Sequence, residues 1–447
     1  MDIDDFTRMI IFSHPTGNAN ARNAIRGLQD ADLLASFLTS VATFDGNLYD
    51  RLSRLPGFQE FNRRRFDTGL QSKTRQNPYR ELLRLLSTRA GLSALTRHET
   101  GPFCIDAVYR SIDRFTAKRL ARQAHAKSGS FTSLKRQNCP PLPSAHLSAA
   151  YAYEDGALET FSTAKSLGLC TIYDLPIGYW RAARKIQTEE GQRFPEWAST
   201  MPALIDSEAK VERKDEELKL ADQIIVASSF TAATLQEAPF ALPEAIVIPY
   251  GCPEVRKIDG VKSTCESDRR SPLKILFVGG LSQRKGLTYL FEAADQLGSA
   301  IELTIIGRKP AAECKPLESA LTKHRWIPSL PHEEILKEMS RHDVFVFPSL
   351  FEGFGLVITE ALSQGLPVIT TPHTCGPDIL TNGEDGFIVP IRDSQSIAEK
   401  LEELHRDRTL LASMSAAARQ TAERNTWSQY RTRLTEAVRS TIETKLS

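Results

Sequence analysis

The stretch LKILFVGGLSQRKGLTYLFEAADQL, residues 273–297, contains the pattern that decides the fold. It begins with a short, mainly apolar run, continues through a pair of glycines, and ends with apolar side chains at helical spacing. A run of this kind predicts a buried strand, and the glycines predict a tight turn before a helix. Strand–turn–helix units of this type build parallel sheets that are covered by helices. Residues 273–297 therefore predict an α/β domain.

The same alternation recurs on both sides of this stretch. In the second half, short apolar runs followed by polar turns lie at 301–310, 343–362 and 365–372. In the first half they lie at 8–28, 168–176, 221–235 and 245–251. Both halves therefore predict doubly wound α/β domains, which bind ligands at the carboxyl ends of their strands and here face each other across a cleft.

The domain boundaries follow from the segment between the two halves. Residues 253–272 are polar and lack periodicity, as is typical of a linker. We therefore expect an N-terminal domain over 1–252, a C-terminal domain over 253–430 and a final helix over 431–447. The final helix is amphipathic, so its apolar face must be covered.

Composition and charge exclude several classes of protein. The formal net charge of +1 argues against a nucleic-acid partner. The seven cysteines form no C-x-x-C pair, which favours reduced thiols in the cytoplasm. The start of the sequence is acidic where a signal peptide is basic, and no apolar stretch approaches the ~18 residues of a spanning helix. The two D-x-D triplets, at residues 2–4 and 30–32, lie outside any strand-end context, so we expect no metal site.

Residues 51–136 are strongly basic. They contain 15 Arg and 4 Lys against six acidic residues, an excess of 19 − 6 = +13. A charged run is usually a solvated face. The alternative that we favour is contact with an anionic partner, either a membrane surface or a charged acceptor, through residues that include Arg63, Arg64 and Arg65.

Two glutamates occupy the stretch FPSLFEGFGLVITEAL, residues 347–362. The preceding strand ends near Pro348, so Glu352 lies in a loop and the helix begins near Gly355. The backbone N–H groups at this helix start suit a phosphate group, and they belong to Gly353, Phe354, Gly355 and Leu356. Glu360 follows on the helix, where it could accept hydrogen bonds from a ribose diol. The alternative is that both glutamates are solvated acids.

The stretches EGFGLVITEALSQGLPVITTP and ILFVGGLSQRKG resemble the donor-site signature of the retaining nucleotide-sugar glycosyltransferases of family 4, which have the GT-B fold. The resemblance implies that Glu360 holds the ribose and Glu352 the hydroxyls of the transferred sugar. It also implies that Lys285 and Arg284 neutralise the diphosphate beside Gly279 and Gly280. This family usually has an arginine where Gly280 stands, and we expect Arg284 to replace it.

The resemblance is thinner over the N-terminal half, which would form the acceptor side. The loop SHPTGNAN lies where the family carries a diphosphate-covering loop, so Gly17 and Asn18 are candidate donor-binding residues; a plain turn is the alternative. Asp174 stands where the family commonly has a histidine facing the donor sugar, and we expect a catalytic role for it. Its alternative is a turn-forming Asp before Leu-Pro. Tyr153, Glu154 and Asp155 are candidates to line the acceptor side.

The sequence thus predicts a cytoplasmic glycosyltransferase that acts without a cofactor or metal. Its donor would be a nucleoside-diphosphate sugar, and its acceptor a glycan, a lipid-linked sugar or another molecule. Breaking the sugar–phosphate bond places negative charge on the diphosphate, so fixed cations can lower the barrier without a protein base. Two alternatives stay open: a nucleotide-sugar epimerase or phosphorylase of the same fold, and a non-catalytic nucleotide-sugar-binding protein.

Overall fold

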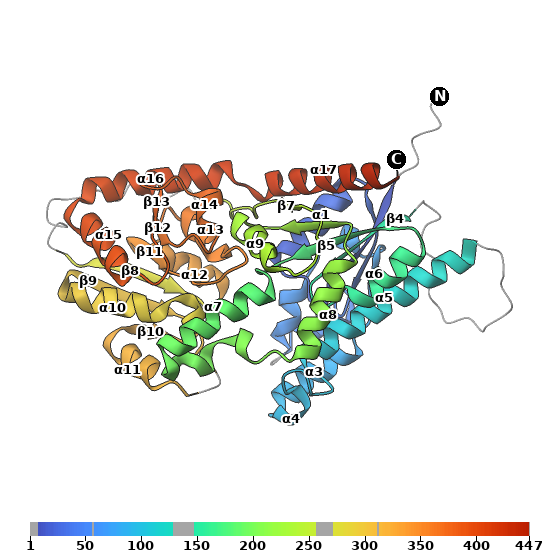
Figure 1. The fold of residues 1–447 in the computed structure, drawn as a ribbon, viewed down its shortest axis with the longest axis horizontal. Coiled ribbons are helices and arrows are strands. Elements are labelled where there is room, and N and C mark those ends of the chain that lie inside the picture. The colour runs from blue at the N-terminus through green and yellow to red at the C-terminus, as the bar shows by residue number, and fades with distance from the viewer. Residues whose placement is uncertain (1–7, 56–57, 128–146, 256–270, 311–312, 447) are drawn as a thin grey trace.

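The computed structural model describes residues 8–55, 58–127, 147–255, 271–310 and 313–446. Figure 1 shows two domains side by side, each built on one sheet. The predicted linker lies mostly outside the described residues. No helix in the described part of the chain is long and apolar enough to cross a membrane.

The N-terminal sheet has seven strands in the order β3-β2-β1-β4-β5-β6-β7, and all its pairs are parallel. Its central strands are buried on both faces, as expected where helices cover the two sides. The strands are β1 (Met9–Ser13), β2 (Leu34–Thr39), β3 (Thr74–Gln76), β4 (Leu147–Tyr153), β5 (Cys170–Leu175), β6 (Gln223–Val226) and β7 (Ala245–Val247). The helices are α1 (Ala19–Asp30), α2 (Leu48–Ser53), α3 (Tyr79–Arg89), α4 (Ser93–Thr96), α5 (Ile105–Lys127), α6 (Leu158–Ser166), α7 (Trp180–Arg193), α8 (Glu208–Lys219) and α9 (Ser229–Thr234).

The C-terminal sheet has six parallel strands in the order β10-β9-β8-β11-β12-β13. The strands are β8 (Leu273–Val278), β9 (Ile301–Ile306), β10 (Arg325–Ile327), β11 (Val344–Phe347), β12 (Val368–Thr370) and β13 (Gly386–Ile388). The helices are α10 (Leu287–Leu297), α11 (Lys315–Lys323), α12 (His332–Met339), α13 (Leu356–Ser363), α14 (Gly376–Ile379), α15 (Ser394–Arg406), α16 (Arg408–Arg424) and α17 (Trp427–Leu446). Both domains are doubly wound, as the sequence predicts.

Strand order locates one point in each sheet where a ligand is expected. The winding of the sheet reverses between β1 and β4 in the N-terminal domain, and between β8 and β11 in the C-terminal domain. Crevices open outside the carboxyl ends of the strands at such switch points. The two switch points are therefore the places to look for a site.

Helix α7 joins the two domains although it follows β5 in the N-terminal sheet. Its Glu190 is fully buried and accepts hydrogen bonds from three C-terminal side chains. The donors are Gln283 Nε2 at 2.8 Å, Tyr289 hydroxyl at 2.8 Å and Arg392 Nε at 2.9 Å. A buried carboxylate needs such partners, so α7 is fixed against the C-terminal domain.

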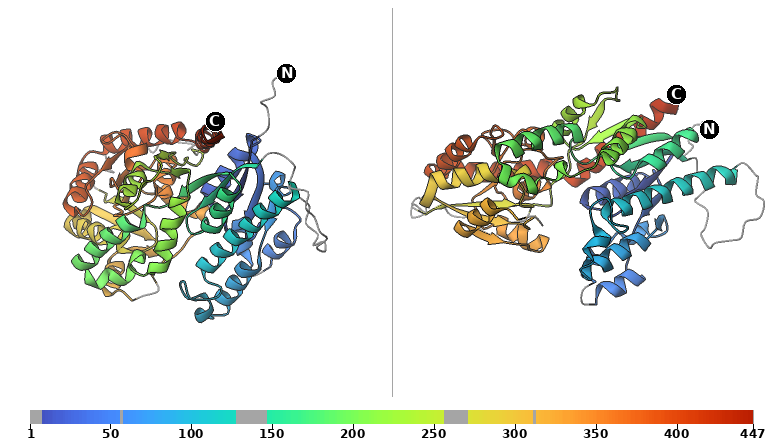
Figure 2. Two further views of the ribbon diagram at one scale, coloured as in Figure 1. Left: turned by 45° about the vertical axis from the view of Figure 1, so that its right-hand side comes forward. Right: turned by 60° about the horizontal axis from the view of Figure 1, so that its bottom comes forward.

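Helix α17 returns from the C-terminal domain to the N-terminal one, as Figures 1 and 2 show. Its apolar stripe, at helical spacing, is buried and consists of Tyr430, Leu434, Val438 and Ile442. Arg431 Nη1 donates to Asn23 Oδ1 on α1 at 3.0 Å, and Lys445 pairs with Asp222 at 2.8 Å. The apolar face that the sequence left without a partner is thus covered by the N-terminal domain.

Candidate functional site

At the C-terminal switch point, the loop after β11 leads into α13. Gly355 precedes the helix with φ 91°, a left-handed conformation that favours glycine. Among the described residues, no hydrogen bond uses the N–H groups of Gly353, Phe354, Gly355 or Leu356. These N–H groups are therefore available to an anion at the helix start.

The two glycines after β8 differ in their surroundings. Gly279 donates its N–H to Ile306 O of the neighbouring strand at 2.9 Å. This residue therefore continues the hydrogen bonding of the sheet, and that N–H is not available to a ligand. A Cβ on Gly280 would meet nothing within 4 Å, so open space surrounds this residue. Of the two glycines after β8 that the sequence predicts for donor binding, only Gly280 borders free space.

A buried charged cluster lies between the two strand ends. Arg284 Nη1 is 2.7 Å from Glu352 Oε1, and Lys285 Nζ pairs with Glu352 Oε2. The Lys285 ammonium also lies 4.8 Å from the centroid of the Phe347 ring. Three of the four residues predicted as catalytic thus lie together in one cluster.

Local backbone geometry explains why these side chains meet. Gly286 ends the short turn that carries Arg284 and Lys285, and it has φ 70°. A Cβ at this position would lie 2.0 Å from Pro348 O, so only glycine fits against the end of β11. Close packing at Gly286 therefore presses the turn onto the strand that leads to Glu352.

Burial and neighbouring charges set the protonation of the cluster. Burial opposes the ionisation of Glu352, yet the charges of Lys285 and Arg284 outweigh it and lower the pKa of Glu352 to about 2. Burial lowers the pKa of Lys285 to about 8. Glu352 is therefore anionic near neutral pH, with two cations as its counter-ions.

Glu360 lies on α13 in a different environment. Its side chain is 20% exposed, and its described ion-pair partner is His332 Nε2 at 3.3 Å. Burial raises the pKa of Glu360 to about 7. Near neutral pH this carboxyl group is therefore poised between its neutral and ionised forms, without the paired cations that hold Glu352.

At the N-terminal switch point, His14 organises the loop after β1. Its Nδ1 accepts hydrogen bonds from the N–H groups of Thr16 at 3.2 Å and Gly17 at 2.7 Å. Burial and the charge of Arg64 lower the pKa of His14 to about 3, so the ring is neutral. The Gly17 N–H is thus used within its own loop, and donor binding by Gly17 stays a prediction. Asn18 caps α1 by accepting the Ala21 N–H at 2.9 Å.

Asp174 also differs from its expected placement. It lies on β5, is 2% exposed, and accepts a hydrogen bond from the Tyr151 hydroxyl at 2.6 Å. Burial raises its pKa to about 7. The Asp174 carboxyl group is therefore buried in the core beside Tyr151, whereas the resemblance implies a side chain that faces the donor sugar. The reason is that β5 directs this side chain into the core.

A cavity of about 300 Å³ opens at the N-terminal switch point. Tyr153, Glu154 and Asp155, predicted for the acceptor side, line it together with His14, Asn18, Tyr109, Asp106 and Lys210. Its charges are balanced by ion pairs: Lys210 with Asp106 at 3.2 Å, Lys214 with Glu154 at 3.2 Å, and Arg213 with Asp155 at 2.9 Å. This paired, tyrosine-containing lining suits a hydroxyl-rich ligand more than an anion.

A cluster of one histidine and two acidic residues lies at the border of the same cavity, which His98 lines. Ligand atoms of His98, Glu99 and Asp206 lie within 4.8 Å of one another. Lys210 pairs with Asp206 at 3.0 Å, and the Ser207 N–H donates to Glu99 at 3.0 Å. Both carboxylates thus already have a hydrogen-bond or ion-pair partner within the protein.

The two switch points meet across the cleft at Gly353. A Cβ there would lie 1.9 Å from Pro176 O, and Pro176 also lines the N-terminal cavity. Gly353 O accepts hydrogen bonds from Ser228 Oγ at 2.6 Å and Thr231 Oγ1 at 2.9 Å. The loop that carries Glu352 is therefore fixed against the N-terminal domain.

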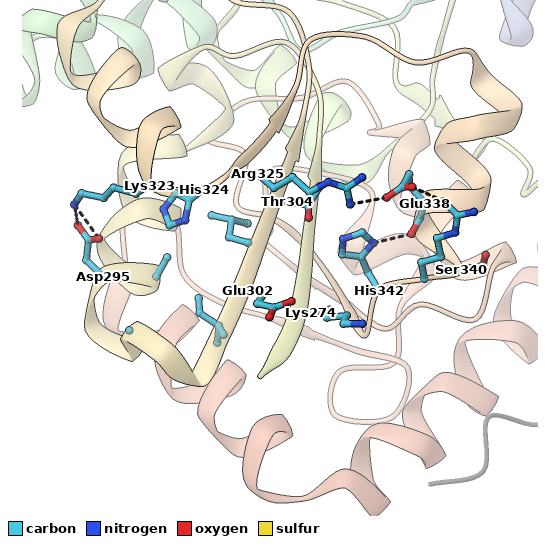
Figure 3. A pocket seen from close by; sticks show the side chains of 15 residues that line it. Lys274, Asp295, Glu302, Thr304, Lys323, His324, Arg325, Glu338, Ser340 and His342 are labelled. Atoms are coloured by element: carbon cyan, nitrogen blue, oxygen red, sulfur yellow. Dashed lines mark hydrogen bonds and ion pairs between the residues drawn. The ribbon is translucent and has the colours of Figure 1, made fainter. Parts of the chain in front are cut away.

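A larger cavity, about 870 Å³, lies away from both switch points (Figure 3). It borders the amino ends of β8 and β9, near Lys274 and Ile301. Several of its charged side chains pair with one another, as Lys323 does with Asp295 at 2.9 Å. None of the predicted site residues lines this cavity.

Solved structures identify the architecture as GT-B. Over 97% of this chain and 98% of the other, the fold matches sucrose-phosphate synthase from Thermosynechococcus elongatus with a TM-score of 0.60 at 15% identity. It matches HepE from Anabaena, solved with UDP, with a TM-score of 0.58 at 13% identity over 97% and 100% of the two chains.

Sequence comparison finds a family match in the C-terminal half. Residues 266–421 match the model of the family glycosyl transferases group 1. The chain is 29% identical to the amylovoran biosynthesis glycosyltransferase AmsK of Erwinia amylovora, over 40% of this chain and 49% of that one. It is 31% identical to the putative colanic acid biosynthesis glycosyltransferase WcaL of Salmonella typhimurium, over 33% and 40%. The chain thus spans half or less of these curated relatives.

Proposed function

We propose that the protein is a retaining glycosyltransferase that moves a sugar from a nucleoside-diphosphate sugar to a hydroxyl group of a glycan or glycolipid. The observation that carries this proposal is the cluster of Arg284, Lys285 and Glu352 beside the unbonded N–H groups at the start of α13. Cations and oriented N–H groups at one place stabilise a diphosphate leaving group.

The cluster suggests how the donor enters. Without a ligand, Glu352 is the counter-ion of both cations. An arriving diphosphate takes over this role, and the freed carboxylate of Glu352 then accepts hydrogen bonds from the transferred sugar. Glu360 would accept hydrogen bonds from the ribose. The structures of HepE with UDP and with UDP-glucose support a donor of this class.

The chemical step follows from these placements. The bond between the sugar carbon and the diphosphate oxygen breaks, and the acceptor oxygen bonds to that carbon on the same face. The acceptor proton passes to a diphosphate oxygen, so no protein base is required. Lys285 and Arg284 supply the positive charge, and we expect no metal or other cofactor to be required.

The acceptor is proposed to bind in the N-terminal cavity, beneath the loop that carries Glu352. Its paired charges and tyrosines favour sugar hydroxyls. The names of AmsK and WcaL refer to polysaccharide biosynthesis, which supports a glycan acceptor.

Transfer assays test this proposal. The protein is incubated with a panel of nucleotide sugars, with and without short glycan acceptors, and product anomers are assigned by NMR. We expect acceptor-dependent diphosphate release, an unchanged anomeric configuration and the same rate in EDTA. Glu352→Gln should abolish transfer, whereas Glu399→Gln on α15 should not. Epimerised donor without transfer, or binding without turnover of any donor, would contradict the proposal.

A further inference from the structure

Helix α3 carries apolar side chains on its outward side, although its other leucines, Leu82 and Leu85, are half-buried against the domain. Tyr79, Leu83 and Leu86 follow one another at i, i+4 and i+7, so they share one helix face. They are 74%, 41% and 53% exposed, whereas Glu81 and Ser87 on the same helix are 1% and 5% exposed. A helix on a globular domain normally buries its apolar stripe. The outward face of Tyr79, Leu83 and Leu86 is therefore left uncovered by the described residues, which is typical of a docking surface.

A buried ion pair fixes this orientation. Glu81 pairs with Arg64, whose side chain is 5% exposed, and with Arg84 at 2.7 Å. Turning α3 to bury Leu83 and Leu86 would take Glu81 away from Arg64 and leave Arg64 buried without a counter-ion, which is strongly unfavourable. The outward stripe is therefore a stable feature of the domain.

Helix α2 extends the same apolar surface. Leu48 and Leu55, seven residues apart, are 66% and 50% exposed. Aromatic contacts link α2 to α3: the Tyr49 ring lies 5.3 Å from that of Phe61, Phe61 stacks on Phe58, and Arg89 of α3 lies over Phe58 at 5.3 Å. We define the α2–α3 surface as Leu48, Leu55, Tyr79, Leu83, Leu86 and Leu92, all of which are at least 41% exposed. Figure 1 shows α3 and α4 at the lower end of the N-terminal domain.

Cations without an acidic partner among the described residues belong to the same segments, and one of them, Arg89, lies over the Phe58 ring. No described residue forms an ion pair with Arg51, Arg89 or Arg97, all of which are exposed. From residue 79 to residue 97 the chain has four arginines and one acid, the buried Glu81. The surface is thus apolar in its centre and positive at its edge.

The arginines predicted from the sequence do not supply this charge. Arg64 is buried against Glu81, and Arg65 pairs with Asp45 and Asp50. Arg63 pairs with Glu60 at 3.3 Å. The charge of the triplet is therefore largely neutralised within the protein, and the arginines on and after α3 take its place.

We propose that the α2–α3 surface docks on an anionic phospholipid bilayer. Leucines and a tyrosine enter the interfacial region, and the arginines meet the headgroups, which is the combination that interfacial helices use. A second copy of the chain fits less well. Two such faces related by a two-fold axis would bring their unpaired arginines together. This inference does not depend on the proposed transfer reaction.

Vesicle co-sedimentation tests the docking. Vesicles of phosphatidylcholine and phosphatidylglycerol at 3:1 are compared with vesicles of phosphatidylcholine alone. We expect the wild type to sediment with the anionic vesicles, less so as salt is raised. The triple variant Tyr79→Ser, Leu83→Ser, Leu86→Ser should lose binding. Arg51→Gln, Arg89→Gln, Arg97→Gln should bind roughly 10- to 100-fold more weakly and with a flatter salt dependence.

Matched controls separate this surface from general charge. Arg406→Gln, Arg424→Gln, Arg433→Gln removes the same charge from exposed positions on α15, α16 and α17 and should bind like wild type. Thermal melting checks that each variant is folded. The proposal is overturned if the wild type ignores anionic vesicles or if the serine variant still binds them. It is equally overturned if ultracentrifugation finds a dimer that the serine substitutions convert to a monomer.

Discussion

The two switch points share a strand order but not a chemistry. In the C-terminal domain, Lys285 and Glu352 form a buried pair beside free N–H groups at the start of a helix. In the N-terminal domain, Lys214 and Glu154 form a comparable pair, with side chains 9% and 8% exposed, at the edge of a cavity. There the N–H groups of the first loop are taken by His14.

This contrast shows which features distinguish an anion site from a neutral one. Both pairs place a lysine beside a glutamate at the carboxyl ends of parallel strands. At the C-terminal pair a second cation, Arg284, contacts the same carboxylate, and backbone donors stay unused; at the N-terminal pair the further cations, Lys210 and Arg213, pair with other acids. The fold determines where ligands approach, and these additional groups determine what kind of ligand is held.

The largest effect is expected from removing the lysine charge at the two switch points in turn. Lys285→Met should lower kcat by about 10³-fold, because the leaving diphosphate loses a fixed cation in the transition state. Lys214→Met, which removes an equally buried charge, should lower kcat far less. Steady-state kinetics with folded variants make the comparison. Equal losses of kcat would show that the two sites do not differ as proposed.

The next effect concerns Asp174, the buried carboxyl group of the N-terminal domain. Its folded pKa of about 7 lies above the unfolded value, so the folded state binds the proton more tightly. The contribution of Asp174 to stability is therefore highest below pH ~4 and declines as pH rises to about 7. Asp174→Asn keeps an acceptor for Tyr151 but removes the charge, so it should be more stable than wild type at pH 8, by up to about 4 kcal/mol.

Urea unfolding of wild type and Asp174→Asn at pH 5 and pH 8 measures this difference. Asp222→Asn is a useful control, because the cations Lys165 and Lys445 help lower the pKa of Asp222 to about 2 against the effect of burial. That variant should instead lose stability at pH 8. An Asp174→Asn variant with the same pH dependence as wild type would mean that Asp174 does not titrate in this range.

The smallest effect is expected at Glu360. Because its pKa lies near 7, its ionised form, the better acceptor for ribose hydroxyls, becomes dominant only above that pH. Affinity for the nucleotide-sugar donor that the transfer assays select should therefore rise about fivefold from pH 6 to pH 8 in the wild type. Glu360→Gln should bind more weakly at pH 8 and show no such rise. Titration calorimetry measures both, and a Gln variant that keeps the pH dependence would exclude Glu360 as its source.

Much of the C-terminal site could be predicted because it follows from local sequence. The glycines of residues 279–286 and 353–355 indicate turns, and alternating apolar runs place these turns at strand ends. Parallel strands then bring Lys285 toward Glu352. The pairing itself, through the contact of Gly286 with Pro348, depends on tertiary packing that the pattern does not contain.

The N-terminal half was harder to predict for the same reason. The ring of His14 accepts two N–H groups of its own loop, and nothing in the sequence distinguishes it from a packing histidine. The direction of Asp174 depends on which face of β5 is buried beside Tyr151. The outward stripe of α3 depends on Glu81 meeting Arg64, 17 residues away. Each of these is a contact between segments, which periodicity does not encode.

The return of α17 to α1 bears on how such proteins can be recombined. Gly27 on α1 leaves so little room that a Cβ would lie 3.0 Å from Arg431 Cβ. A chimaera joined within residues 253–272 would bring a foreign final helix against this closely fitted face. A C-terminal domain can therefore be exchanged between relatives only together with an α1 that fits its last helix. The sequence of α1 in one domain thus constrains the sequence of α17 at the end of the other.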